Sequence, residues 1–304
     1  MTKTRKEKES RVLLELYRQG EQIALADPKS KDISYLARGL HNLILPRSKP
    51  KSERIEIQNG DLNVVIVALD KKIGLPYGSY PRLIRYYIED QVYKKHKNNE
   101  EEPQKVYFGR SAREFFELLG IPWGGKSAKI LRKQGEAFIK SQVFIQKTFE
   151  RFEGSVGLKI DITKGDYVWL WSRSDPEQQA LFENYIKVSD EYFKEITSRP
   201  LPIDMRVVSS LKRWAMALDI YMFLTARLFS LQKRTLIPWG QLSLQFGGHE
   251  FERDRKFREE FKINLKRVQK ICIDTRLKLT ENGLSIDPTL PTVKPKKKIK
   301  AKIS

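Results

Sequence analysis

The sequence repeats one order of predicted elements: a short helix, a basic amphipathic helix and a two-stranded hairpin. In the first occurrence, the capping box Ser111-Ala-Arg-Glu114 opens the short helix, and residues 127–142 form the amphipathic one. Val143–Phe149 and Val156–Ile162 alternate apolar and polar residues on either side of the turn residues Glu153-Gly154. This order is typical of a winged-helix domain, in which the hairpin is the wing.

The second occurrence lies near the end of the chain. Trp239–Phe246 is the short helix, and Arg253–Cys272 is the basic amphipathic helix. Asn282-Gly283, a strong hairpin turn, separates the predicted strands Asp274–Thr280 and Leu284–Asp287. The sequence therefore predicts an α+β, mostly helical protein with two winged-helix units in tandem.

These elements divide the 304 residues into four predicted parts. Residues 1–53 are a helix and a linker, partly disordered, and the helix spans residues 1–26. Residues 54–199 are the first winged-helix domain and open with a hairpin that turns at Asn59-Gly60. Residues 200–290 are the second, which opens with a long helix over Asp204–Leu231, and residues 291–304 are a disordered basic tail.

Charge indicates the class of partner. The chain has 58 Lys and Arg against 38 Asp and Glu, a net charge of +20. Residues 1–11 contribute +3 and residues 294–304 contribute +6, which leaves +11 on the middle of the chain. An excess spread over folded segments favours nucleic acid over a membrane surface, which would need one basic amphipathic helix or an anchor.

Several function classes are disfavoured by what the sequence lacks. The single cysteine, Cys272, excludes an internal disulfide framework and cysteine-rich zinc sites. The histidines are His41, His96 and His249, too far apart in sequence for a His-x-His metal nuclease signature. The most apolar window, Trp214–Leu231, contains two charged residues, and no signal peptide is recognisable. We expect a cytoplasmic protein with no metal site, no cofactor and no membrane contact.

The two basic helices carry the candidate DNA contacts. On the first helix, Ile130 and Phe138 fall on the side predicted to be buried; on the second, Phe257 and Phe261 do. The predicted contacts of the first unit are Lys126, Lys129, Arg132, Lys133, Lys140 and, in the hairpin turn, Arg151; those of the second unit are Arg255, Lys262, Lys266, Lys270 and, in its hairpin, Arg276. For one helix alone, a solvated face is the competing interpretation. Which of these residues would contact bases rather than phosphates stays open.

One motif suggests a different chemistry. Residues 120–127, Gly-Ile-Pro-Trp-Gly-Gly-Lys-Ser, match the G-x-x-x-x-G-K-S pattern of a phosphate-binding loop. That loop requires a buried strand leading into it, whereas a capped helix is predicted before Gly120, and Pro122 has no N–H to donate. A glycine-rich turn between two helices is therefore favoured over ATP binding.

Five further motifs resemble the RepA-type plasmid replication initiator family. They are Gly74-Leu-Pro-Tyr-Gly-Ser-Tyr-Pro-Arg82, Phe108-Gly-Arg-Ser111, Asp204-Met-Arg-x-Val-x-x-Leu-Lys212, Ala217-Leu-Asp-x-Tyr221 and Ile237-Pro-Trp239. The resemblance covers about residues 60–291 and implies paired winged-helix units and sequence-specific binding at a plasmid origin. It transfers no catalytic residue.

The function expected from charge and resemblance together is that of a non-enzymatic, plasmid-encoded bacterial initiator. It would bind double-stranded DNA at the plasmid origin and, as the resemblance implies, recruit the host initiator and replicative helicase. A winged-helix transcriptional repressor or copy-control protein is the second hypothesis, and a P-loop ATPase the third. The residues do not decide between a monomer and a homodimer.

Overall fold

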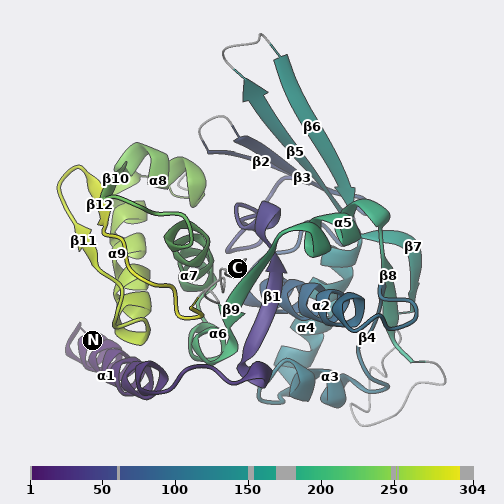
Figure 1. Ribbon diagram of the computed structural model, residues 1–304, viewed down its shortest axis with the longest axis horizontal. Coiled ribbons are helices and arrows are strands. Elements are labelled where there is room, and N and C mark those ends of the chain that lie inside the picture. The colour runs from purple at the N-terminus through teal and green to yellow at the C-terminus, as the bar shows by residue number, and fades with distance from the viewer. Residues whose placement is uncertain are drawn as a thin grey trace, which may run out of the picture.

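The computed structural model describes residues 2–59, 62–149, 154–168, 183–247, 251 and 253–294, and it is an α+β structure (Figure 1). The helices are α1 Thr2–Leu25, α2 Ser79–Lys97, α3 Ala112–Leu118, α4 Gly125–Ile139, α5 Asp190–Ser198, α6 Met205–Leu211, α7 Ala215–Leu228, α8 Trp239–Gln245 and α9 Asp254–Ile271. The strands are β1 Ile33–Ala37, β2 Arg54–Asn59, β3 Leu62–Ala68, β4 Lys105–Tyr107, β5 Ser141–Phe149, β6 Gly154–Asp161, β7 Thr163–Val168, β8 Tyr185–Val188, β9 Pro200–Asp204, β10 Thr235–Pro238, β11 Leu277–Leu279 and β12 Gly283–Ile286. The α+β class is confirmed.

Two hydrophobic cores organise the chain. The first lies among α2, α3, α4 and the strands of the first half, with Phe115 and Phe138 fully buried. The second lies among α6, α7, α8 and α9, with Phe257 and Phe261 fully buried, and it also takes Leu16 from α1. Burial of these large side chains is the main stabilising term for each half.

The first core is covered by a sheet larger than the predicted hairpins. The strands at residues 54–69 and 143–162 were predicted as two separate hairpins, and the structure joins them in one antiparallel sheet of order β2-β3-β5-β6. Val64 of β3 faces Ile145 of β5 in the register of this pairing. A second sheet, β4-β8-β7, pairs strands that periodicity did not predict.

The second core follows the predicted order more closely. The elements run α7, β10, α8, α9, β11 and β12, and the predicted hairpin at residues 274–287 gains β10 as a third strand, in the order β10-β12-β11. The prediction of a single helix over Asp204–Leu231 is wrong. Trp214 adopts an extended backbone (φ −120°, ψ 101°) that separates α6 from α7. Trp214 there lies against Arg267 of α9, with 4.6 Å from guanidinium carbon to ring centroid. The apolar periodicity continues through this break, so periodicity alone does not reveal it.

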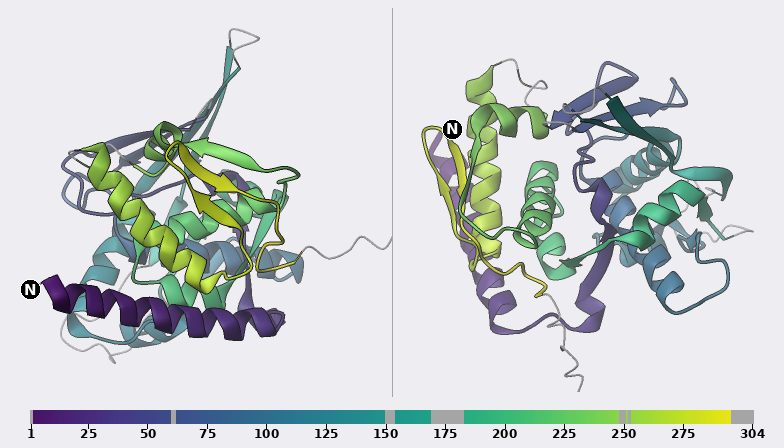
Figure 2. Two further views of the ribbon diagram at one scale, coloured as in Figure 1. Left: turned by 90° about the vertical axis from the view of Figure 1, so that its left-hand side faces the viewer. Right: turned by 45° about the horizontal axis from the view of Figure 1, so that its top comes forward.

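The N-terminal residues pack onto the second half of the chain. The predicted first helix is confirmed as α1, and both views of Figure 2 place it alongside α9. A Cβ on Gly20 would lie 2.4 Å from the carbonyl oxygen of Lys270, so this close approach requires glycine. The segment Arg199–Pro202, predicted as the junction between domains, contributes to β9, which pairs with β1.

A buried ion pair joins the two halves. Arg82 of α2 donates from Nε and Nη2 to the two carboxylate oxygens of Asp219 of α7, at 2.7 and 2.6 Å. The side chains are 2% and 6% exposed. Arg82 also donates to the carbonyls of Leu45, Pro46 and Gly78, so its guanidinium is fully engaged. A buried charge pair of this kind is tolerated only when the partner charge and hydrogen bonds compensate both groups for the loss of water.

Replacing Asp219 with Asn should therefore destabilise the whole protein. The substitution keeps the shape of the side chain and leaves the charge of Arg82 buried without a counter-ion. We expect a loss of about 3–5 kcal/mol in the free energy of unfolding, measured by urea denaturation. The matched control is Glu56→Gln in the exposed Arg54–Glu56 pair, 2.8 Å apart, which should cost about 0–1 kcal/mol. Equal effects of the two substitutions would contradict this account.

Candidate nucleic-acid interface

Helix α9 presents three different faces. Its apolar face carries Phe257, Phe261 and Leu265 into the second core. A second face lies against α1, where Arg267 donates to both carboxylate oxygens of Glu9, at 3.1 and 2.8 Å. The third face is open to solvent.

The open face of α9 is strongly basic. It carries Arg255, Arg258, Lys262, Lys266 and Lys270, all exposed. Glu259, the acidic residue among them, is paired with Arg255 at 3.0 Å. The four residues that the sequence predicted on this helix thus share one accessible surface, bordered by α1, whose Tyr17 ring lies 5.0 Å from the Lys270 Nζ.

The hairpin after α9 also carries exposed basic side chains. Arg276, predicted as a contact, is exposed immediately before β11, and Lys278 is exposed within that strand. Asp287, beyond the end of β12, binds Arg234 through both its carboxylate oxygens, which lowers the pKa of the carboxyl group. That carboxylate is therefore partly neutralised by its own partner.

Helix α4 presents a similar but narrower basic face. Lys126, Lys129 and Lys133 are exposed along one side, and Arg132 is half-buried at its edge. Ile130, predicted to be buried, is 46% exposed and borders the same side. A partly apolar border next to three lysines differs from the wholly charged face of α9.

Two of the DNA contacts predicted for the first unit are not found on the open face of α4. Arg151 lies outside the described residues. Lys140 is only partly exposed, and its Nζ lies 3.1 Å from Glu136 Oε1 and 3.4 Å from Asp70 Oδ2. Partial burial opposes the charge of Lys140, but these carboxylates prevail and raise its pKa. The expectation that Lys140 lies on the open face is corrected: it braces α4 against the turn that contains Asp70.

Sequence reasoning missed four lysines in the first half. Lys49 and Lys51 lie in the predicted linker, and Lys71 and Lys72 precede the motif that begins at Gly74. With Lys133, they line one cavity of about 450 Å³ beside α4. The available signal was a pair of lysines in each of two turn segments, but nothing in the sequence placed the two segments together.

The glycine-rich turn at residues 120–127 connects two helices, as predicted. Gly120 follows α3 with φ +60°, and its N–H bonds to the carbonyl of Glu117 as in a helix C-terminus. Lys212, at the end of α6, donates to the Gly120 carbonyl. The element that enters the turn is α3, not the strand that a phosphate-binding loop requires.

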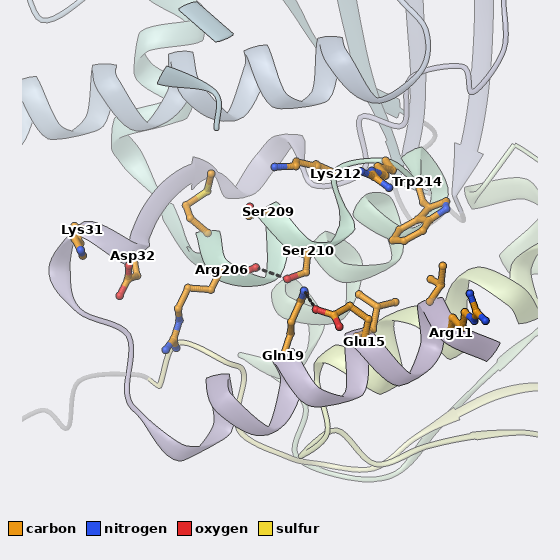
Figure 3. A pocket seen from close by; sticks show the side chains of 14 residues that line it. Arg11, Glu15, Gln19, Lys31, Asp32, Arg206, Ser209, Ser210, Lys212 and Trp214 are labelled. Atoms are coloured by element: carbon orange, nitrogen blue, oxygen red, sulfur yellow. Dashed lines mark hydrogen bonds between the residues drawn. The ribbon is translucent and has the colours of Figure 1, made fainter. Parts of the chain in front are cut away.

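A larger cavity, of about 950 Å³, separates α1 from α6 (Figure 3). Two hydrogen bonds join residues of its walls: Gln19 donates to Glu15 at 2.8 Å, and the Ser210 hydroxyl donates to the carbonyl of Arg206 at 2.9 Å. Arg206 is held by Asp204 through Nε and Nη2.

Two further findings concern the residues that the structure describes. Among them, no group of three or more His, Cys, Asp or Glu side chains is arranged to hold a metal ion. None of the described helices has the length and apolar content needed to cross a bilayer. The dominant feature of the described surface is its positive charge.

The comparison with protein families decides the identity. A family model described as "Plasmid encoded RepA protein" matches residues 75–241, more than half of the chain. The chain belongs to the plasmid-encoded RepA family. The resemblance carried by the motifs is thus confirmed, and the protein is a member of a plasmid replication initiator family. The matched span of this RepA-family protein includes α4 and both partners of the Arg82–Asp219 pair, and it ends within α8.

A solved structure shows a similar fold at low sequence identity. The crystal structure of a selenomethionine derivative of domains 2 and 3 of RctB aligns with a TM-score of 0.50 and 10% identity, covering 83% of this chain and 98% of that one. A second RctB structure, of domains 2–3, has a TM-score of 0.49 and 11% identity and covers 82% and 96%. At this identity, the likeness concerns the fold alone. No curated protein matches the sequence.

The Lys126→Ala variant tests the role of the glycine-rich turn. Because Lys126 is an exposed residue in the first turn of α4, its loss should remove one phosphate contact, which lowers the magnitude of the log–log salt slope of DNA binding by about one. Millimolar ATP with magnesium should not bind to the unmodified protein, since Pro122 offers no N–H and a helix enters the turn. Saturable ATP binding that disappears in Lys126→Ala would overturn this interpretation.

Proposed function

We propose that this RepA-family protein initiates plasmid replication by binding origin DNA sequence-specifically, with α4 and α9 as its two recognition helices. The observation that carries the proposal is the shared arrangement of these helices. Each buries one face in its own core, leaves a lysine-rich face open, and is followed by a hairpin.

The order of elements supports a winged-helix interpretation of both halves. In the second half, three helices and a sheet of order β10-β12-β11 match a helix–strand–helix–helix–hairpin unit. The first half has the same order of elements along the chain from α2 to β6, although its hairpin continues into β3 and β2 and its strand β4 pairs with β8 instead of with the hairpin. In each unit, the helix before the hairpin would enter the major groove, which has the width to admit it.

The chemistry of the open faces suits DNA. Lysines at positions 126, 129, 133, 262 and 266 would bind phosphates and fix the position of the protein. Arg132, Arg255 and Arg258 carry the planar fork that pairs with the guanine edge. Such contacts do not require an enzymatic activity or a cofactor, and we propose none.

We propose the later steps of initiation on the basis of the family membership alone. They are the opening of adjacent A·T-rich DNA and the recruitment of the host initiator and replicative helicase. A cytoplasmic location in a plasmid-bearing bacterium follows from the same proposal. The functional unit is a monomer or a homodimer.

Binding to origin DNA tests the proposal directly. Two engaged units should give a log–log salt slope of magnitude about 5 or more, because each lysine–phosphate contact releases counterions. Joint substitution of Lys129, Arg132 and Lys133 by Ala should abolish specific footprints while the fold is retained. A slope near zero for the unmodified protein would refute DNA binding through these faces.

A genetic experiment separates initiation from repression. The gene and its flanking DNA, placed on a marker without a replicon, should support replication of that marker. Footprints on flanking DNA without replication would favour the repressor or copy-control function instead.

A further inference from the structure

The cavity beside α4 is lined by five lysines from three separate segments. We propose that this lysine groove, formed by Lys49, Lys51, Lys71, Lys72 and Lys133, binds the phosphate backbone of the DNA next to the segment contacted by α4. The inference rests on the proposed function and extends the interface beyond the two recognition helices.

The charge of the lysine groove is hardly compensated. All five lysines are exposed, and among the residues that line the cavity the only carboxylate is Glu53. Glu53 lies 3.5 Å from Lys71, and both side chains are highly exposed, so this pair is weak. Five like charges around one cavity of about 450 Å³ repel one another, and an anion that occupied it would relieve that repulsion.

The turn that carries Lys71 and Lys72 is held in a fixed position. Asp70 accepts from the N–H of Lys72 through Oδ1, at 3.0 Å, and its carbonyl accepts from the N–H of Gly74 at 2.9 Å. Asp70 Oδ2 also binds Lys140 at the end of α4. The Lys140 brace thus holds the lysine-bearing turn beside the open face of α4.

The opposite wall, residues 46–53, is anchored at both ends. The Pro46 carbonyl accepts from the N–H of Gly78 at 2.9 Å, and the Glu53 carbonyl accepts from the N–H of Ala68 at 2.9 Å. Arg47 donates to the carbonyl of Gly247 at 3.0 Å, which ties this segment to the end of α8 in the second half. Lys49 and Lys51 are therefore displayed on a fixed segment that reaches both halves.

The arrangement fits a phosphodiester backbone better than a base edge. Lysine ammonium groups are point charges that bind phosphate without reading sequence. Lys133 belongs both to the groove and to the exposed side of α4, where Lys129 and Lys126 lie about one and two turns away. The row of lysines on α4 thus continues into the groove, and a DNA strand that follows α4 would enter it.

The test compares two double variants of the full-length protein. Lys51→Ala/Lys72→Ala removes one lysine from each wall of the groove. Lys97→Ala/Lys194→Ala makes the same change in net charge at a distance. Lys97 ends α2, about 27 Å along the helix from its first residue, Ser79, and Lys194 follows Phe193, whose ring contacts His96 at 5.3 Å.

With origin duplexes, the groove variant should lower the magnitude of the log–log salt slope by about 2, since about 0.9 is lost per phosphate contact. The preference for origin over scrambled DNA should stay within about twofold, because phosphate contacts carry no sequence information. The distant control should leave the slope unchanged. Lys51→Arg/Lys72→Arg should restore it, which shows that charge and not folding is responsible.

The outcomes separate the two proposals. If the unmodified protein shows no salt-dependent binding to origin DNA, the proposed function itself fails. If the unmodified protein binds with a steep slope and the groove variant matches it, only the lysine groove is refuted. A groove variant with an unchanged slope that no longer maintains the plasmid would assign these lysines to an acidic protein partner and would equally overturn the inference.

Discussion

The buried contact between Arg82 and Asp219 is the constraint on which the arrangement of the two halves depends. It joins α2 of the first core to α7 of the second with both charges removed from water. A guanidinium in such a site is tolerated only when its donors are satisfied, and the carbonyls of residues 45, 46 and 78 complete the set. This places the segment at residues 46–53 and the start of α2 against the second half. The same contact therefore fixes both the relative position of the two halves and one wall of the lysine groove.

Two of the family motifs supply the residues of this contact between the halves. Arg82 ends the motif that begins at Gly74, and Asp219 lies in the motif Ala217-Leu-Asp-x-Tyr221, so two segments 137 residues apart form one contact. Tyr221, in the second of these motifs, contacts the motif that begins at Asp204, because its hydroxyl accepts from the backbone N–H of Asp204 at 2.9 Å. Residues of these motifs thus contact one another in this structure, whereas the lysines of the groove and of α9 supply the charged surface.

Sequence reasoning succeeded where the signal is local. The amphipathic periods of α4 and α9 and the turn at Asn282-Gly283 depend on neighbouring residues, and the structure has these elements close to the predicted ranges. It failed where the partner is distant: β1 and β9 pair across more than 160 residues, and each is too short to be recognised by alternation. Lys140 shows the same limit within a site. Its position on the helix was predicted, but the carboxylate of Asp70 that engages it comes from a turn seventy residues earlier.

The central claim is that two basic helices, held in one fixed relation, contact two segments of the same DNA. Binding to origin duplexes with insertions between those segments tests it most directly. An insertion of about 5 bp turns the second segment to the opposite side of the duplex, since B-DNA repeats every ~10.5 bp. We predict that this insertion lowers affinity by at least about tenfold, equivalent to about 1.4 kcal/mol, because the Arg82–Asp219 junction prevents the halves from rotating independently. Affinity that is unchanged by the insertion would contradict the claim and would show that the halves bind separately.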